Sequence, residues 1–133
     1  MESDGRDFAD VLKDAQDMGY AEADPSFDID GVDAAHKLAI MASLCFGTQL
    51  DFEGVELAGI RKILAADIAQ ARDLGYRIRL IGHAEIDGEN GDACLFQRVS
   101  PRLVSKNHPL AHVTDATNAV VAEGNFSGRL LFQ

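Results

Sequence analysis

The sequence has no long apolar segment. No run of about 18 apolar residues occurs, so no part of it has the pattern of a helix that spans a bilayer. Met1 is followed by the acidic residues Glu2 and Asp4 and by no apolar stretch, a start that is wrong for a secretory signal peptide. We therefore expect a cytoplasmic protein with no membrane partner.

Basic residues are also scarce. The 133 residues include 12 Lys and Arg against 22 Asp and Glu, which gives a formal net charge of -10. Proteins bind nucleic acid largely by neutralising phosphates with Lys and Arg. A chain with this excess of acids is not expected to have a nucleic-acid partner.

Glycine motifs that hold phosphates are missing, and cysteine is rare. Neither G-x-G-x-x-G nor a P-loop occurs, and the "GENG" stretch lies in a predicted hairpin turn. The G-x-S-x-G elbow of many hydrolases is absent too. The two cysteines, Cys45 and Cys94, are separated in the sequence and are predicted to be reduced and buried. No cofactor is expected to bind to this chain alone.

The first half of the chain has helical periodicity. Three helices are predicted, at about residues 4–18, 31–46 and 65–74. Gly19 and Gly47 suit the left-handed position that ends a helix, and Asp30 suits the N-cap of the second one. The second helix has an apolar stripe, formed by Leu38, Met41, Ala42 and Cys45. "ARDLGY" repeats the form of "AQDMGY", which we interpret as two similar glycine caps.

From Tyr76 onward the pattern becomes that of strands. "YRIRLIGHAEI" and "ACLFQRVSPRLV" flank the turn "DGENGD", and "NAVVAEGNFSGRLLF" predicts a second hairpin. Pro101 cannot donate to a ladder, so it should lie at an edge or a bulge. The predicted class is α+β: helices in the first half packed on a mostly antiparallel or mixed sheet that is built from C-terminal hairpins. Residues 1–133 are expected to form a single domain.

An acidic stretch precedes the second helix. Its five carboxylates are Glu22, Asp24, Asp28, Asp30 and Asp33. One helix start needs one cap and perhaps one further acid, and the remaining acids repel one another unless a cation compensates them. Asp33 and Lys37 are four residues apart and share a helix face, a pairing that by itself is most often a solvated ion pair. A lysine and a bound ammonium group would both compensate the cluster.

The four histidines give weaker signals. His108 and His112 are spaced to share a metal, but neither a third ligand nor a general-base Glu accompanies them, so we predict no metal site. His36 is expected on a different helix face from Lys37. For His83, in a predicted strand, the expected role is packing or surface.

The acidic stretch and the helix after it resemble a known catalytic segment. "GYAEADPSFDIDGVDAAHKLAIMASLCFG" is similar to that of homoserine dehydrogenases: a Glu, an Asp-Pro, a further Asp, then Gly-x-Asp-x-Ala-x-Lys opening a helix. The matching positions are Glu22, Asp24, Pro25, Asp28, Gly31, Asp33, Ala35 and Lys37. "GRDFADVLKDAQ", "ADIAQARDLGYRIRLIG" and "QRVSPRLVSKNHPLAHV" also resemble the family, so the similarity covers almost the entire chain.

The resemblance implies a reaction and four roles. The family interconverts L-homoserine and L-aspartate 4-semialdehyde with NAD or NADP, in the biosynthesis of threonine, methionine and isoleucine. Glu22 would hold the substrate's ammonium group, and Asp28 would complete the polar wall. Lys37 would be the catalytic proton donor and acceptor, oriented by Asp33. Asp24 and Asp30 would be turn and cap residues.

The sequence departs from the family by lacking the Rossmann domain and its glycine fingerprint. We therefore expect an excised substrate-binding and catalytic domain, inactive by itself and forming a homodimer, whose parent enzyme uses NADP or NAD. A second interpretation is a free-standing, non-enzymatic module that binds an amino acid or only dimerises. A third is another dehydrogenase with a related α+β domain.

Overall fold

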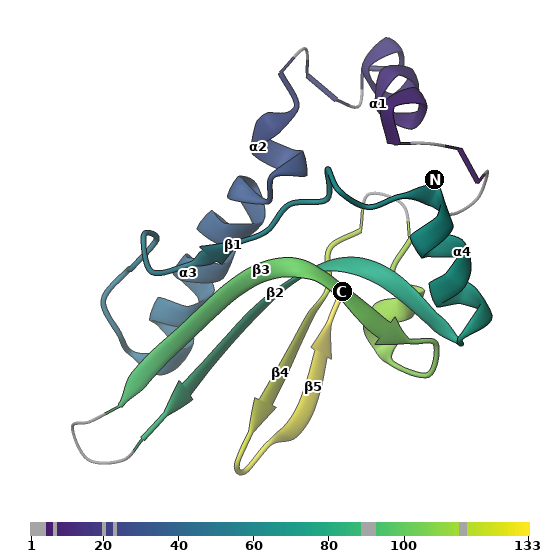
Figure 1. Ribbon diagram of the computed structural model, residues 1–133. Helices are drawn as coiled ribbons and strands as arrows, with labels where there is room; N and C mark the ends of the chain where they lie inside the picture. Colours follow the sequence, from purple (N-terminus) through teal and green to yellow (C-terminus); the bar gives the residue numbers. More distant parts are fainter. Residues whose placement is uncertain (1–4, 7, 20, 23, 89–92, 115–116) are drawn as a thin grey trace.

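A computed structural model describes residues 5–6, 8–19, 21–22, 24–88, 93–114 and 117–133. Its elements in chain order are α1 (Phe8–Asp17), α2 (Ser26–Ile29), α3 (Val32–Phe46), β1 (Glu56–Leu57), α4 (Ala65–Asp73), β2 (Tyr76–Asp87), β3 (Cys94–Ser105), the 3₁₀ helix η1 (Pro109–His112), β4 (Val120–Gly124) and β5 (Gly128–Phe132). The predicted α+β class is confirmed (Figure 1). None of the described helices combines the length and the apolar character needed to cross a membrane.

The largest sheet is built on the first predicted hairpin. β2 and β3 pair antiparallel from Tyr76 opposite Ser105 to Asp87 opposite Cys94. β1 lies on the other side of β3 and pairs with it in parallel, giving the order β1-β3-β2. The second predicted hairpin, β4–β5, forms a two-stranded sheet of its own, as Figure 1 shows. The sequence predicted both hairpins, but neither β1 nor the division into two sheets.

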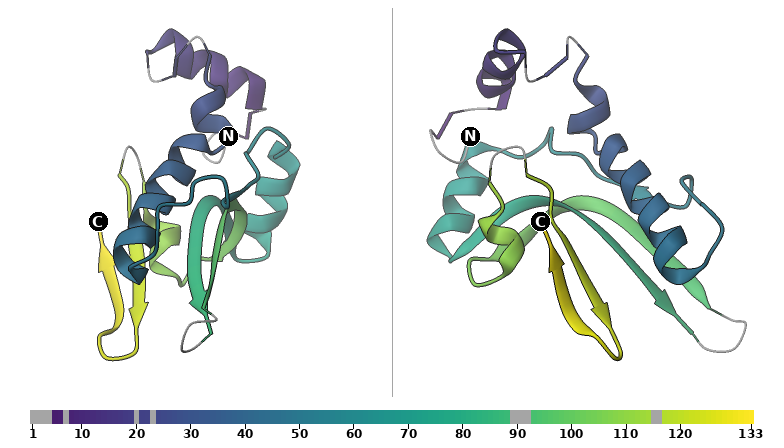
Figure 2. Two further views of the ribbon diagram at one scale, coloured as in Figure 1. Left: turned by 90° about the vertical axis from the view of Figure 1, so that its left-hand side faces the viewer. Right: turned by 180° about the vertical axis from the view of Figure 1, so that it is seen from behind.

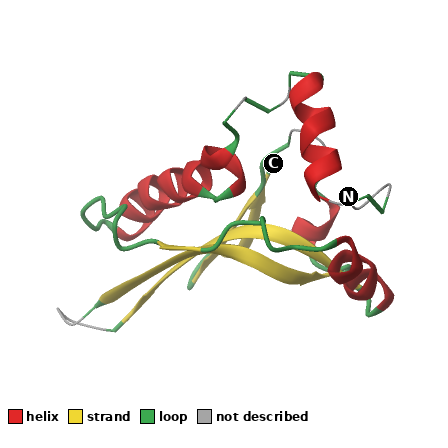
Figure 3. Ribbon diagram, turned by 45° about the horizontal axis from the view of Figure 1, so that its top comes forward, coloured by secondary structure: helices red, strands yellow, loops and turns green. Residues whose placement is uncertain are grey.

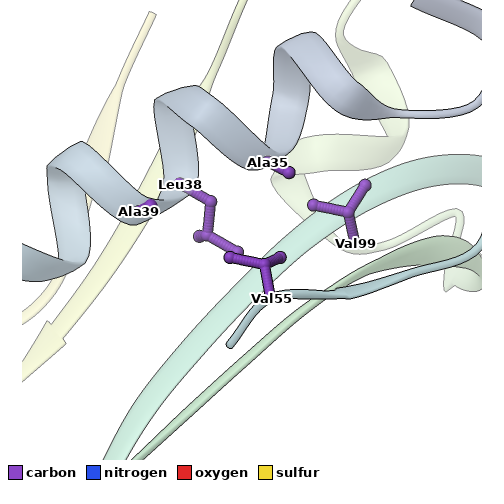
Figure 4. Close-up of a cluster of buried hydrophobic side chains, with 5 residues drawn as sticks. All are labelled: Ala35, Leu38, Ala39, Val55 and Val99. Carbon is purple, nitrogen blue, oxygen red and sulfur yellow. The ribbon is translucent and has the colours of Figure 1, made fainter. Parts of the chain in front are cut away.

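The core lies where α3 crosses one face of the β2–β3 ladder. Its buried residues are Ala35, Leu38, Ala39, Val55 and Val99 (Figure 4). Small side chains on α3 and Gly82 on β2 permit this close approach, since a Cβ atom at Gly82 would be 3.4 Å from Leu38. α4 packs on β2 as well, toward the opposite end of the ladder (Figure 3). α1 buries no residue and stands away from the sheet (Figure 2).

Several local predictions match the structure. α4 covers Ala65–Asp73, against a predicted 65–74. Gly19 and Gly75 both have positive φ, 76° and 83°. The Gly19 amide donates to the Gln16 carbonyl at 3.0 Å, and the Gly75 amide to the Arg72 carbonyl at 3.1 Å. The two similar stretches are therefore two similar helix ends.

Other local predictions fall outside the described residues or at the edge of the sheet. Asp4 and most of the "DGENGD" turn lie outside the described residues, but Gly5 and Arg6 are described and are not helical, so the prediction that the first helix runs from residue 4 is wrong, and α1 is described from Phe8. Pro101 lies in β3, two residues beyond the part of that strand that pairs with β1. At Pro101 the described neighbour of β3 is therefore β2 alone, as expected for an edge.

The prediction that both cysteines are buried is wrong. Cys45 and Cys94 are free and exposed. The buried residues of α3 are Ala35, Leu38, Ala39 and Ala42; Cys45 continues this face by its spacing, but it lies in the last turn of the helix, beyond the last buried residue. Cys94 is the first residue of β3, at the end of the ladder.

Gly31 is predicted to tolerate no side chain. It has φ 83°, and a Cβ atom there would be 3.0 Å from Val99 Cγ1. The Val99 side chain is fully buried in the core. Gly31→Ala should therefore add a steric contact to the roughly 1–2 kcal/mol of left-handed strain. Gly47 ends the same helix with φ 67°, and nothing lies within 4 Å of its Cβ position.

Gly47→Ala is therefore the matched control, because it introduces the left-handed backbone strain without a steric contact of the new Cβ atom. In chemical denaturation of the 133-residue chain, Gly31→Ala is expected to lower the free energy of unfolding by about 2–3 kcal/mol and Gly47→Ala by about 1 kcal/mol. Equal losses would show that Val99 does not constrain this junction.

Candidate active site

Within the acidic stretch, Ser26–Ile29 form the short helix α2. Its first turn is prepared by Asp24, whose Oδ1 accepts a hydrogen bond from the Ser26 amide at 3.1 Å. Hydrogen bonds from Ser26, first from its side chain and then from its amide, lower the pKa of the Asp24 carboxyl. The role of Asp24 as a turn residue is confirmed.

Asp30 is not the N-cap of α3, contrary to the prediction. α3 begins after Gly31, and no side chain caps it. Asp30 is instead the residue that ends α2, and its carboxylate binds Arg61. Arg61 Nε donates to Asp30 Oδ1 at 2.5 Å and Nη2 donates to Asp30 Oδ2 at 2.8 Å. This guanidinium lowers the pKa of the Asp30 carboxyl below its usual value. The left-handed Gly31 occupies the N-cap position of α3, so the Asp30 carboxylate is available for its contact with the distant Arg61.

The predicted pair of Asp33 and Lys37 is present. Lys37 Nζ lies 2.6 Å from Asp33 Oδ2, one turn apart on α3. The side chains remain 57% and 41% exposed, so the ammonium group is held by one carboxylate and is still accessible to a ligand. A lysine oriented in this way can exchange a proton with a group bound beside it.

Glu22 and Asp28 are both exposed. The backbone carbonyl of Glu22 accepts a hydrogen bond from Gln16 Nε2 at 2.9 Å, which ties this segment to α1. Within the described part of the chain, neither carboxylate is paired with a basic side chain. Two different cations therefore neutralise two of the acids: Arg61 pairs with Asp30 and Lys37 pairs with Asp33. Glu22 and Asp28 remain available for other partners.

The histidines have structural surroundings. The His36 ring packs edge-on against Phe52 and Phe27, with centroid distances of 4.1 and 5.5 Å, while Lys37 pairs with Asp33. His108 Nδ1 accepts the Leu110 amide at 3.2 Å and caps η1. Among the described residues, no group of three or more His, Cys, Asp or Glu could hold a metal ion.

The described helices do not form a dinucleotide site. Such a site needs a glycine-rich turn between a strand and a helix, with the pyrophosphate at the helix N-terminus. α3 follows the helix α2 instead of a strand. α4 follows a loop, and its N-cap residue is Leu64 instead of a glycine. The described residues therefore do not include the strand–turn–helix arrangement in which a nicotinamide dinucleotide binds.

Arg61 is the site residue that sequence reasoning missed. It lies thirty-one positions from Asp30, on the loop after β1. No local spacing relates an arginine in a loop to an acid in a separate helix, so no signal in the single sequence identifies this contact.

The structure is an α+β unit, and its Asp33–Lys37 pair lies in the first two turns of α3. The homoserine dehydrogenase family model matches residues 1–133. A homoserine dehydrogenase from Synechocystis sp. is 47% identical over 132 residues, which are 99% of this chain and 30% of that protein. The chain belongs to the homoserine dehydrogenase family.

Solved structures agree with this assignment. A homoserine dehydrogenase from Thiobacillus denitrificans superposes with a TM-score of 0.91 at 45% identity, over 98% of this chain and 30% of that one. A hyperthermophilic archaeal homoserine dehydrogenase in complex with NADPH has a TM-score of 0.70 at 29% identity, over 97% of this chain and 34% of that one. The chain spans about 30% of the length of the relatives that it matches.

Proposed function

We propose that residues 1–133 are the substrate-binding and catalytic domain of an enzyme that interconverts L-homoserine and L-aspartate 4-semialdehyde. The observation that carries this proposal is the pair of Lys37 and Asp33, with Nζ 2.6 Å from Oδ2, following two exposed carboxylates in the segment that the family shares. The substrate has one ammonium group and one reacting oxygen, and the site offers acids for the first and a lysine for the second.

Each residue has a distinct task in this proposal. Glu22 binds the substrate ammonium through a charge-assisted hydrogen bond, and Asp28 extends the polar wall. Lys37 takes the hydroxyl proton during oxidation and returns it to the carbonyl oxygen during reduction. Asp33 holds the Lys37 side chain in place, because its carboxylate already contacts Nζ.

NADP or NAD is the hydride acceptor, and parts of the parent enzyme outside these 133 residues bind it. The NADPH in the archaeal relative supports a nicotinamide dinucleotide as the cofactor. We place the parent enzyme in the cytoplasm and assign it a role in amino-acid biosynthesis. The experiment is to express this segment with its flanking coding sequence and to follow homoserine-dependent reduction of NADP and NAD. Absence of turnover with both cofactors would overturn the proposal.

The isolated chain is predicted to be folded, dimeric and inactive. Its accessible surface is 9299 Å², against roughly 6,800 Å² for a compact monomer of this mass. Much apolar surface is uncovered, including Leu130, Leu131 and Phe132 on β5, and uncovered apolar surface favours association. We therefore expect a dimer by light scattering, one cooperative melting transition and no tight binding of NADP by calorimetry.

A charged variant tests the part of the surface that associates. Leu131→Glu places a carboxylate on the exposed β5 strand and should shift the dimer toward the monomer with little change in the melting temperature. A monomeric wild-type chain, or a tight NADP isotherm, would contradict this description of the domain.

A further inference from the structure

The junction between α2 and α3 determines how the proposed site residues face one another. α2 carries Asp28, and α3 carries Asp33 and Lys37. The two helices are joined through Asp30 and the left-handed Gly31. A rotation at this junction would move Asp28 relative to Lys37, so the site depends on what holds the junction.

The junction is held from outside by the loop that follows β1. No side chain caps the start of α3, and Gly31 at that position has no side chain to hold it. The Ile60 amide donates to the Ile29 carbonyl at 2.8 Å. Gly59 lies so close that a Cβ atom there would be 2.4 Å from the Ile29 carbonyl oxygen. The loop backbone therefore lies directly against the last turn of α2.

Arg61 completes this contact and spans α2 from end to end. Its Nη2 donates to Ser26 Oγ at 2.8 Å, at the first residue of α2, and to Asp30 Oδ2 at 2.8 Å, at the C-cap that follows Ile29. Its Nε donates to Asp30 Oδ1 at 2.5 Å. The planar guanidinium makes a two-pronged contact that fixes an angle as well as a distance, which a lysine cannot reproduce.

We propose that Arg61 is a positioning residue for the homoserine site: it holds α2 so that Asp28 and the Asp33–Lys37 pair face the same ligand. This inference rests on the proposed function. Among the described residues, Arg61 donates hydrogen bonds to Ser26 and Asp30, and its side chain is half exposed, so its removal should disturb the geometry of the site more than the stability of the fold.

The test uses the full-length enzyme. Arg61→Ala is expected to lower kcat/KM for homoserine about 10²-fold, the effect of displacing reacting groups by about 1 Å, while the KM for NADP stays within about twofold. Arg61→Lys keeps the charge and loses the two-pronged contact, so it should recover only a small part of the activity. Arg98→Lys is the matched control, because Arg98 forms a comparable exposed pair with Glu56 and should retain wild-type kinetics.

A double-mutant cycle separates positioning from a general loss of structure. If Arg61 acts through Asp30, the Arg61→Ala/Asp30→Ala enzyme should be no slower than Arg61→Ala alone. Arg61→Lys with wild-type kcat/KM would overturn the proposal, as would losses that multiply in the double variant. An Arg61→Ala enzyme with a lower apparent kcat, caused by a smaller folded fraction, and an unchanged KM for homoserine would also overturn the proposal. That result indicates a structural role. If the wild-type enzyme does not oxidise homoserine, the proposed function fails instead.

Discussion

Lys37→Ala is expected to lower the kcat of the full-length enzyme by about 10²-fold or more. This is the usual scale for the loss of an acid–base group. Lys37 is held 2.6 Å from Asp33 and is exposed enough to meet a substrate oxygen, so its removal takes away the proposed proton-transfer group. Steady-state kinetics in both directions, at saturating homoserine and saturating aspartate semialdehyde, measure the effect.

Two further variants define the role of Lys37. Lys37→Arg retains a positive charge next to Asp33 but cannot release a proton at neutral pH, so its kcat should also be low. Lys13→Ala removes an exposed lysine from α1 and should leave kcat unchanged. A Lys37→Ala enzyme within a few-fold of wild type would show that this lysine does not transfer the proton.

Glu22→Gln is expected to raise the KM for homoserine about 10- to 100-fold, because one charge-assisted hydrogen bond to the ammonium group is lost. The melting temperature should hardly change. Glu22 is exposed, and it lies too far from the start of α3 at Val32 to cap that helix. Initial rates over a range of homoserine concentrations, together with a melting curve, test both statements.

A substrate that lacks the ammonium group provides the control. 4-Hydroxybutyrate has the chain and the hydroxyl of homoserine without the amine, so Glu22 has no cation to bind in it. Glu22→Gln should therefore leave kcat/KM for 4-hydroxybutyrate unchanged while lowering it for homoserine. Equal losses with the two substrates, or a large fall in melting temperature with an unaltered KM, would assign Glu22 a structural role.

What the sequence determined by itself is local. The glycine caps at Gly19 and Gly75, the α4 helix and the two hairpins were predictable, since each depends on residues within a few positions of one another. The contact between Asp33 and Lys37 is local in the same sense. Residues four apart on a helix lie on one face in any fold that contains the helix.

What only the tertiary structure decided depends on distant residues. Whether Asp30 caps a helix or binds Arg61 is settled by a loop thirty-one residues away. β1 pairs in parallel with β3 across forty-two positions, from Glu56 to Arg98, and a two-residue strand has no pattern of its own. Cys45 shares the helix face of Leu38 and Ala42 by its spacing, yet it is exposed, because the buried part of α3 ends before the last turn. Periodicity shows which residues share a helix face, but the position of the neighbouring sheet selects the face that is buried.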